Sequence, residues 1–335
     1  MRKTGGRRKG SPWITAGKLA ALFLTVAAVT AAFYLLSEEE DFFLKPYEAE
    51  NQAANISRSF QIDTQLFAAD LCVVTDTSQP EEPLDAGAAL IFNISDREAV
   101  YQQGAFDRLY PASVTKIMTY LVVAEHGDLS QKVTITDAML DLDPQSSTAG
   151  LKGGDIFVME DLLYGMLMVS GNDAAQAMAL TVAGTEQEFA RMMNEKAQEL
   201  GATGTHFVNA HGLTDEQHYT TAYDLYLILN EALKDPRFVE IISTPEHTAY
   251  YTGAGGSERE CTWSAGTWYA SGQVAAPEGF TVVGGKTGTT SAAKYCMALY
   301  SRDEAGKEYI SVVLRSPSRD VLYYNLNALF SKITN

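Results

Sequence analysis

Cysteine and basic residues are both scarce in this chain, and each scarcity excludes a class of protein. Only three of the 335 residues are cysteine, which is too few for a disulfide-rich scaffold. None forms a Cys-x-x-Cys pair or a zinc-ligand spacing, and the five histidines show no metal motif, so we expect no metal site. Lys and Arg number 25 against 42 acidic residues, which argues against a nucleic-acid partner, because such proteins cluster basic residues.

The cysteines, Cys72, Cys261 and Cys296, leave two interpretations open. If this part of the chain is exported, one disulfide and one free thiol can form. Alternatively all three are small buried side chains, which is the interpretation we favour. The histidines are expected to be surface groups or satisfied core groups, with His211 as the one candidate for another role.

The charge is distributed unevenly along the chain. The first 18 residues hold six basic residues and no acidic one, so the remainder carries a net charge of −23. An uncharged run follows at 19–36, and with 13–17 and a snorkelling Lys18 it reaches the ~20 residues that span a bilayer. Because basic residues precede the run and acidic ones follow it, we expect a cytoplasmic tail at 1–12 and a transmembrane anchor at 13–36.

A cleaved signal peptide is the alternative to this anchor. The apolar region of a signal peptide usually runs about 7–15 residues and ends at a small-x-small site. Here the run is longer and ends in the bulky residues 33–36, although alanines at 27–32 supply small side chains for cleavage. We therefore expect an exported body that follows a linker at 37–86, either anchored in the membrane or secreted.

The remaining chain is predicted to contain strands, then helices, then strands again. Short strands are expected at 71–74, 88–94 and 98–101, the last two as a hairpin. Helical spacing follows at 114–122, 158–180 with a break at 170–172, 189–200 and 222–233. Further strands are expected at 262–271, 280–283, 294–301 and 309–314, before a helix at 320–333. This order indicates one α+β domain at 87–335 with a helical subdomain.

Three short motifs occur in order along this domain. They are S-V-T-K at 113–116, S-G-N at 170–172 and K-T-G at 286–288. Each alone is weak, because S-x-x-K recurs at 291–294 and K-T-G recurs at 3–5. Context separates the first set, since its members open a predicted helix, interrupt a helical region and follow an apolar strand. The repeats lie in a loop and in the basic tail.

The chemistry of a serine nucleophile accounts for this spacing. Helix residues three apart share a face, so Lys116 lies one turn beyond Ser113 and can reach its hydroxyl. A lysine serves as base only if burial or a second cation depresses its pKa, and Lys286 is the expected second cation. The amides of Ser113 and Thr289 are expected to form an oxyanion hole, with Gly288 leaving room for substrate on the strand.

These residues resemble those of the serine penicillin-recognising enzymes. Flanking segments narrow the resemblance to the D-alanyl-D-alanine carboxypeptidases, the low-molecular-mass penicillin-binding proteins. The similar segments are Y-P-A-S-V-T-K-I-M-T at 110–119, D-L-L-Y-G at 161–165, S-G-N-D-A-A at 170–175, F-V-N-A-H-G-L at 207–213 and G-K-T-G-T-T at 285–290. The resemblance covers about 86–330 and implies a beta-lactamase/transpeptidase-like fold, in which helices flank an antiparallel sheet.

The resemblance also implies a reaction. Ser113 would form an acyl-enzyme with the penultimate D-Ala of a peptidoglycan stem pentapeptide and release the terminal D-Ala, with Lys116 as base. Ser170 and Asn172 would relay protons and hold the substrate amide. The expected substrate-binding residues are Lys286, Thr287, Gly288 and Thr289. No metal or organic cofactor is implied, beta-lactams would acylate Ser113, and the protein would belong to the bacterial cell membrane.

Two departures and three alternatives accompany this resemblance. Ala210 stands where the family usually has proline, and the chain ends fewer than fifty residues after Gly288, which leaves no room for the second domain of many members. A class A-type beta-lactamase is disfavoured, because 204–209 lacks its deacylating glutamate. A D,D-endopeptidase or transpeptidase would use the same residues, and a non-catalytic penicillin-sensing receptor would not need the complete set.

Overall fold

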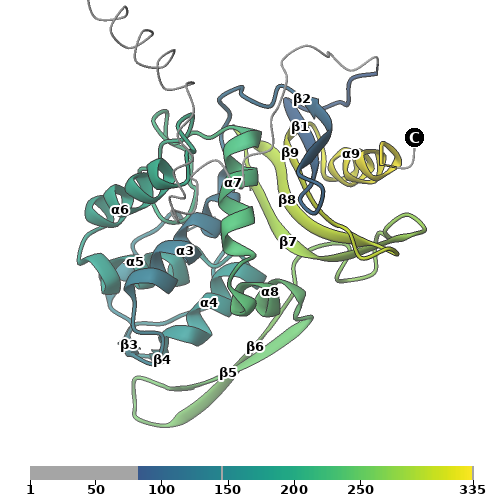
Figure 1. The fold of residues 1–335 in the computed structure, drawn as a ribbon. Helices are drawn as coiled ribbons and strands as arrows, with labels where there is room; N and C mark the ends of the chain where they lie inside the picture. The colour runs from purple at the N-terminus through teal and green to yellow at the C-terminus, as the bar shows by residue number, and fades with distance from the viewer. Residues whose placement is uncertain (1–81, 145, 334–335) are drawn as a thin grey trace, which may run out of the picture. The chain divides into compact units, whose positions relative to one another are not determined.

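The core of the molecule is a five-stranded antiparallel sheet with most of the helices on one face and helix α9 (Arg319–Ser331) on the other (Figure 1). The computed structural model describes residues 82–144 and 146–333. The strand order is β2-β1-β9-β8-β7, and every neighbouring pair runs antiparallel. The strands are β1 (Ala88–Asn93), β2 (Glu98–Gln103), β7 (Phe280–Thr290), β8 (Lys294–Asp303) and β9 (Glu308–Ser316). This sheet confirms the α+β class and the hairpin expected near residue 95.

Both faces of the sheet are buried, which explains why its inner strands are mostly apolar. Alternate β1 residues, among them Leu90 and Phe92, pack with the larger helical layer. The residues between them, Ala89 and Ile91, pack with α9 (Arg319–Ser331) on the opposite face. Since successive strand residues point to opposite faces, the run Ala88–Asn93 supplies two cores at once.

The larger helical layer holds the segments that carry two of the three motifs. Its elements are η2 (Ala112–Thr115), α3 (Lys116–His126), α4 (Met159–Met168), α5 (Asn172–Ala183), α6 (Glu186–Glu199), α7 (Ala222–Ala232) and α8 (Pro236–Ser243). The predicted break at 170–172 is confirmed, because α4 ends at Met168 and α5 begins at Asn172. A short 3-10 turn, η3 (Asp137–Leu140), lies before α4 in the chain.

A second antiparallel sheet was only partly expected from the sequence. It has the order β3-β4-β5-β6, with β3 (Lys132–Thr134), β4 (Ile156–Val158), β5 (Glu246–Thr252) and β6 (Glu258–Ser264). Figure 1 shows β5 and β6 as a long hairpin below α8. The strand expected at 262–271 is wrong beyond Ser264, because Trp268 and Tyr269 lie in a turn and pack on Tyr323 of α9.

Two other elements differ from the prediction. Helix α8, which was not predicted, begins at Pro236, because proline suits the first helical turn and Asp235 caps it by accepting from Arg237 N–H. Strand β7 continues to Thr290, well past the expected end at 283, since its glycine-rich part pairs with β8. The K-T-G motif therefore lies inside a strand.

Some expectations fall outside the described residues. These are the basic tail, the span at 13–36, the short strand at 71–74 and Cys72. Within 82–144 and 146–333, the helices are too short or too polar to cross a membrane. Cys261 and Cys296 lie on different sheets and are not bonded to each other.

Candidate active site

The fold brings the three motifs together at the junction of the helical layer and β7. Ser113 lies in η2, and Lys116, the first residue of α3, places Nζ 3.0 Å from Ser113 Oγ. Ser170 lies in the break between α4 and α5, where its Oγ is 3.0 Å from Lys286 Nζ of β7. Two serine–lysine pairs therefore meet in one site.

Lys116 is buried completely and surrounded by oxygen atoms. Besides Ser113 Oγ, its Nζ lies 2.6 Å from Asn172 Oδ1 and 2.6 Å from the backbone oxygen of His211. Burial, together with the nearby charge of Lys286, holds the pKa of Lys116 well below its usual range, although Asp173 opposes the shift. The structure thus supports the expectation that Lys286 acts as the second cation.

The three partners also set the direction of the Lys116 lone pair. Asn172 Oδ1 and His211 O can only accept, so they take two of the hydrogens on Nζ. When the amine is neutral, two hydrogens and one lone pair remain, and the third direction faces Ser113 Oγ. The lone pair is therefore aimed at the serine hydroxyl, as a general base requires.

Lys286 occupies a different environment, although it is equally buried. Its Nζ donates to Ser170 Oγ and, over 2.9 Å, to the backbone oxygen of Thr287. Burial lowers the pKa of Lys286 to about 7. Lys286 therefore acts on the site through the Ser170 hydroxyl and through its charge on Lys116.

Gly288 is required by the protein's own backbone. A Cβ at this position would lie 2.7 Å from Pro111 O and 3.0 Å from the amide nitrogen of Ser113. Contacts below about 3.0 Å force the backbone apart, so any larger residue would push η2 away from β7. We expected Gly288 to leave room for substrate. The structure gives another reason for a glycine here, because the turn that carries the nucleophile occupies the space of a side chain.

An open cleft of about 600 Å³ contains the nucleophile. Among the predicted residues, Ser113, Asn172 and Thr289 line it. Thr287 instead borders a cavity of about 20 Å³ shared with α8. Asp143, Ser146 and Ser147 from the loop before α4, and residues 212–214 and 290–291, complete the lining of the cleft.

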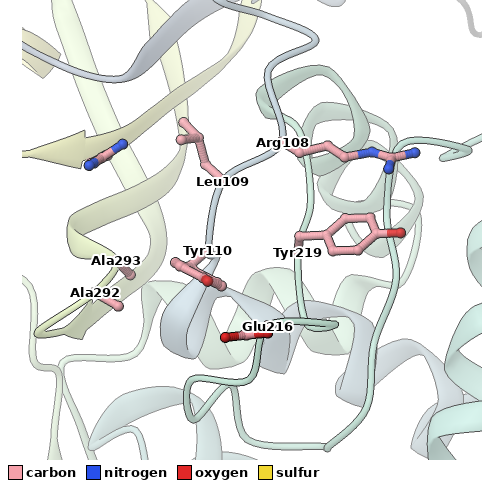
Figure 2. Close-up of a pocket in the computed structure, with 8 residues that line it drawn as sticks. Arg108, Leu109, Tyr110, Glu216, Tyr219, Ala292 and Ala293 are labelled. Carbon is pink, nitrogen blue, oxygen red and sulfur yellow. The ribbon is translucent and has the colours of Figure 1, made fainter.

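A second cavity has a volume of about 260 Å³ and is lined by residues close in sequence to those of the cleft (Figure 2). Tyr110, Glu216 and Ala292 line it, and the Arg108 guanidinium sits 4.7 Å from the centre of the Tyr219 ring. None of the three motifs contributes to its lining. We therefore assign the chemistry to the larger cleft, which contains Ser113.

Two contributions to the site were missed by sequence reasoning. The His211 backbone carbonyl holds Lys116, so the part of His211 that matters at the lysine is not its side chain. Asp173 accepts hydrogen bonds from the amides of residues 149–151 and so anchors the loop beside the cleft. An acidic residue in the first turn of a predicted helix was the available signal, because such residues often bind backbone amides.

The repeated S-x-x-K at 291–294 does not form a comparable pair. Ser291 and Lys294 lie at the turn between β7 and β8, and Lys294 is exposed with a φ of 58°. Their three-residue spacing therefore does not place them on one helical face. The prediction that the S-x-x-K at 291–294 is not a functional motif agrees with this position. The repeated K-T-G at 3–5 lies outside the described residues.

Comparison with known proteins agrees with this geometry. The D-alanyl-D-alanine carboxypeptidase family matches residues 74–318, which is well over half of the chain. The chain belongs to this family. Members of the family are serine hydrolases, and the segment that matches contains all three motifs.

Relatives and solved structures of the family are similar over different lengths. The D-alanyl-D-alanine carboxypeptidase of Streptomyces sp. strain K15 is 32% identical over 76% of this chain and 88% of its own length. DacC of Escherichia coli is 33% identical over 69% of this chain, but over only 56% of its own length. For DacF of Bacillus subtilis the identity is 36%, over 48% of this chain and 42% of the relative.

The structural likeness covers the catalytic part. The crystal structure of the Streptomyces K15 DD-transpeptidase superposes with a TM-score of 0.70 at 30% identity, over 76% of this chain and 98% of that one. A penicillin-binding protein homologue from Mycobacterium tuberculosis reaches a TM-score of 0.67 at 25% identity, over 78% and 96%. The fold is therefore of the transpeptidase type, as the sequence resemblance implied.

Proposed function

We propose that this protein is a serine D-Ala-D-Ala carboxypeptidase that removes the terminal D-Ala from peptidoglycan stem pentapeptides. The observation that carries the proposal is the Lys116 amine, buried and oriented by two carbonyl oxygens toward Ser113 Oγ at 3.0 Å. The family match adds support, because several relatives carry the name of this activity.

The acylation step follows from these positions. Ser113 Oγ attacks the carbonyl carbon of the penultimate D-Ala while its proton passes to Lys116 Nζ. The amides of Ser113 and Thr289 stabilise the oxyanion that forms. As the peptide bond breaks, the leaving amine takes a proton from Ser170 Oγ, which Lys286 Nζ replaces over 3.0 Å.

Hydrolysis completes the cycle. Exchange with solvent first removes the proton from Lys116 and returns one to Lys286. A water molecule in the open cleft then attacks the acyl-Ser113 ester and loses a proton to Lys116, which passes it to Ser113 Oγ as the tetrapeptide leaves. Both lysines are then in their starting protonation states. The charge of Lys286 and the Thr287 and Thr289 segment attract and hold the terminal carboxylate of the substrate, while Asn172 holds its amide.

Beta-lactams and the membrane enter the same proposal. A beta-lactam ring presents a strained amide to Ser113, so penicillin forms a stable acyl-enzyme there. The uncharged run at 19–36, with basic residues before it, anchors the protein in the bacterial cell membrane and leaves the catalytic domain outside. Secretion after cleavage within 27–32 is the alternative, and the mass of the mature protein distinguishes the two.

The chemistry is tested with a fluorescent penicillin. We expect covalent labelling of the wild-type protein, loss of the label in Ser113→Ala, and unchanged labelling in Ser291→Ala, the matched control from the repeated motif. Incubation with a stem pentapeptide should then release D-Ala and leave a tetrapeptide. Labelling that persists in Ser113→Ala would overturn the assignment of the nucleophile.

Transpeptidation is the second candidate, and one observation favours it. The Streptomyces K15 relative is named a carboxypeptidase in one comparison and a DD-transpeptidase in the other. The acyl-enzyme is common to both reactions, which differ in whether water or an amine attacks it. Adding an amine acceptor to the pentapeptide assay separates them, because a transpeptidase forms the aminolysis product at the expense of tetrapeptide.

A further inference from the structure

Ala112, the residue before the nucleophile, has an uncommon backbone conformation. Ala112 is buried and adopts a φ of +48°, in the left-handed region that non-glycine residues rarely occupy. Such conformations persist only where the surroundings enforce them. The same planar unit carries the Ala112 carbonyl at one end and the Ser113 N–H at the other, so fixing the carbonyl also fixes the amide.

Two contacts hold the Ala112 carbonyl. Thr115 Oγ1 donates a hydrogen bond to it over 2.8 Å. Gly212 packs against it so closely that a Cβ there would lie 2.0 Å from Ala112 O. The carbonyl is therefore confined between the first turn of the nucleophile helix and the loop after α6.

A buried histidine determines that the Thr115 hydroxyl points at this carbonyl. His218 Nδ1 accepts a hydrogen bond from Val208 N–H over 3.2 Å, so the ring proton is on Nε2. His218 Nε2 lies 2.8 Å from Thr115 Oγ1 and donates to it. The threonine hydrogen is then free only for Ala112 O, and the hydrogen bonds run in one direction.

The relay does not depend on titration of its histidine. His218 and Thr115 are each no more than 1% exposed. Burial, with a smaller contribution from the charge of His211, lowers the pKa of His218 to about 3, so the ring is neutral near pH 7. Its tautomer is set by Val208 and stays constant, as a fixed structural support requires.

We propose that His218 and Thr115 are positioning residues, which aim the Ser113 amide at the carbonyl oxygen of the substrate by holding the Ala112 carbonyl. This inference rests on the proposed function only in that Ser113 must be the acylated serine. Neither residue touches the substrate. Their effect is on the oxyanion, and therefore on the acylation rate more than on substrate binding.

The helix that carries Thr115 supplies a matched control. Thr119, one turn further along α3, is also fully buried and donates its hydroxyl hydrogen to a backbone oxygen, that of Ala210, over 2.5 Å. Thr115→Val and Thr119→Val lose the same kind of hydrogen bond and keep the side-chain shape. Only Thr115→Val releases the peptide unit that carries the Ser113 amide.

The experiment measures acylation by penicillin and by a matched pair of ester and thionoester substrates. Loss of one oxyanion donor costs about 10²–10³-fold, so misdirection of the amide in Thr115→Val should slow acylation about 10–100-fold. Thr115→Ser retains the donor and should restore the rate, and Thr119→Val should stay near wild type. KM for the ester should change little.

The thionoester gives a readout that a merely structural role would not move. Its sulfur accepts hydrogen bonds poorly, so it gains little from an aligned amide, and Thr115→Val should lose much of the wild-type preference for the ester. An unchanged preference, equal losses in Thr115→Val and Thr119→Val, or no rescue in Thr115→Ser would overturn the inference. If wild-type Ser113 is not acylated, the proposed function and this inference both fail, whereas acylation without D-Ala release contradicts the carboxypeptidase alone.

Discussion

The two buried lysines of the site, Lys116 and Lys286, have similar hydrogen-bond partners and different electrostatics. The Nζ atom of each lysine lies 3.0 Å from the hydroxyl oxygen of a motif serine, Ser113 for Lys116 and Ser170 for Lys286. Lys116 faces two fixed carbonyl oxygens, and burial together with the charge of Lys286 depresses its pKa strongly. Lys286 is depressed by burial alone, to about 7. The comparison suggests that one lysine works as a neutral base and the other as a cation.

The largest effect on the acylation rate is expected when Lys116 is replaced by arginine. Arginine stays protonated, so the long side chain and its hydrogen-bond donors are kept and the base is lost. We expect Lys116→Arg to slow acylation by fluorescent penicillin by about 10³-fold, in the range found for loss of a general base. Lys294→Arg, from the repeated motif, serves as control and should acylate normally. A variant Lys116→Arg that acylates within tenfold of wild type would argue against this base.

The cation role of Lys286 is tested by arginine and glutamine together. Wild-type kcat/KM for a stem pentapeptide should fall as pH rises through about 7, because Lys286 then loses the charge that attracts the terminal carboxylate. Lys286→Arg holds its charge and should lack this alkaline decline. Lys286→Gln should lose about 10²-fold at pH 6, mostly through loss of that electrostatic attraction. Equal pH profiles in wild type and Lys286→Arg would contradict the division of roles.

Lys286 should also lower the free energy of unfolding of the protein. Its folded pKa of about 7 lies below its usual value of 10.5, so the buried charge destabilises the fold fully below pH 7 and progressively less as pH rises toward 10.5. Lys286→Met should therefore raise the free energy of unfolding by ~1–3 kcal/mol near pH 6, and the gain should shrink at alkaline pH. Denaturant titrations at both pH values measure it. A gain that grows with pH would have the wrong sign.

Asp173 offers the mildest test of the Lys116 environment. Its carboxylate raises the pKa of Lys116, against the larger effects of burial and Lys286. The acylation rate should fall at low pH as Lys116 becomes protonated. In Asp173→Asn this fall should occur at a lower pH, because Lys116 loses its proton more easily. The loop at 149–151 loses an acceptor, which should cost about 1 kcal/mol of stability. A fall that moves to higher pH would show that Asp173 does not support the protonated lysine.

Much of the site could be predicted, because its key spacing is local. Ser113 and Lys116 are three residues apart at a helix start, and that proximity depends only on helical geometry. The break at 170–172 was visible as a polar interruption in an apolar pattern. In contrast, the reason for Gly288 was predicted incorrectly, because the close approach of Pro111 and Ser113 to β7 leaves no trace in the residues around 288.

The elements that were missed had weak or misleading local patterns. Helix α8 begins at Pro236, a residue type that usually interrupts helices, although its position in the first turn is compatible with a helix. Trp268 and Tyr269 have strong strand propensity, yet they lie in a turn and their rings pack against Tyr323 of α9. In both cases tertiary packing outweighed the local preference.

By itself, the sequence determined the reactive side chains, the helix that positions Ser113 beside Lys116, and the family to which these motifs belong. Only the tertiary structure decided that Ser170 and Lys286 meet across 116 residues, and that His218 reaches Thr115 across 103. Such contacts depend on how helices pack on a sheet. The depressed pKa values of the lysines belong to the same class, because they arise from burial, and burial exists only in the assembled fold.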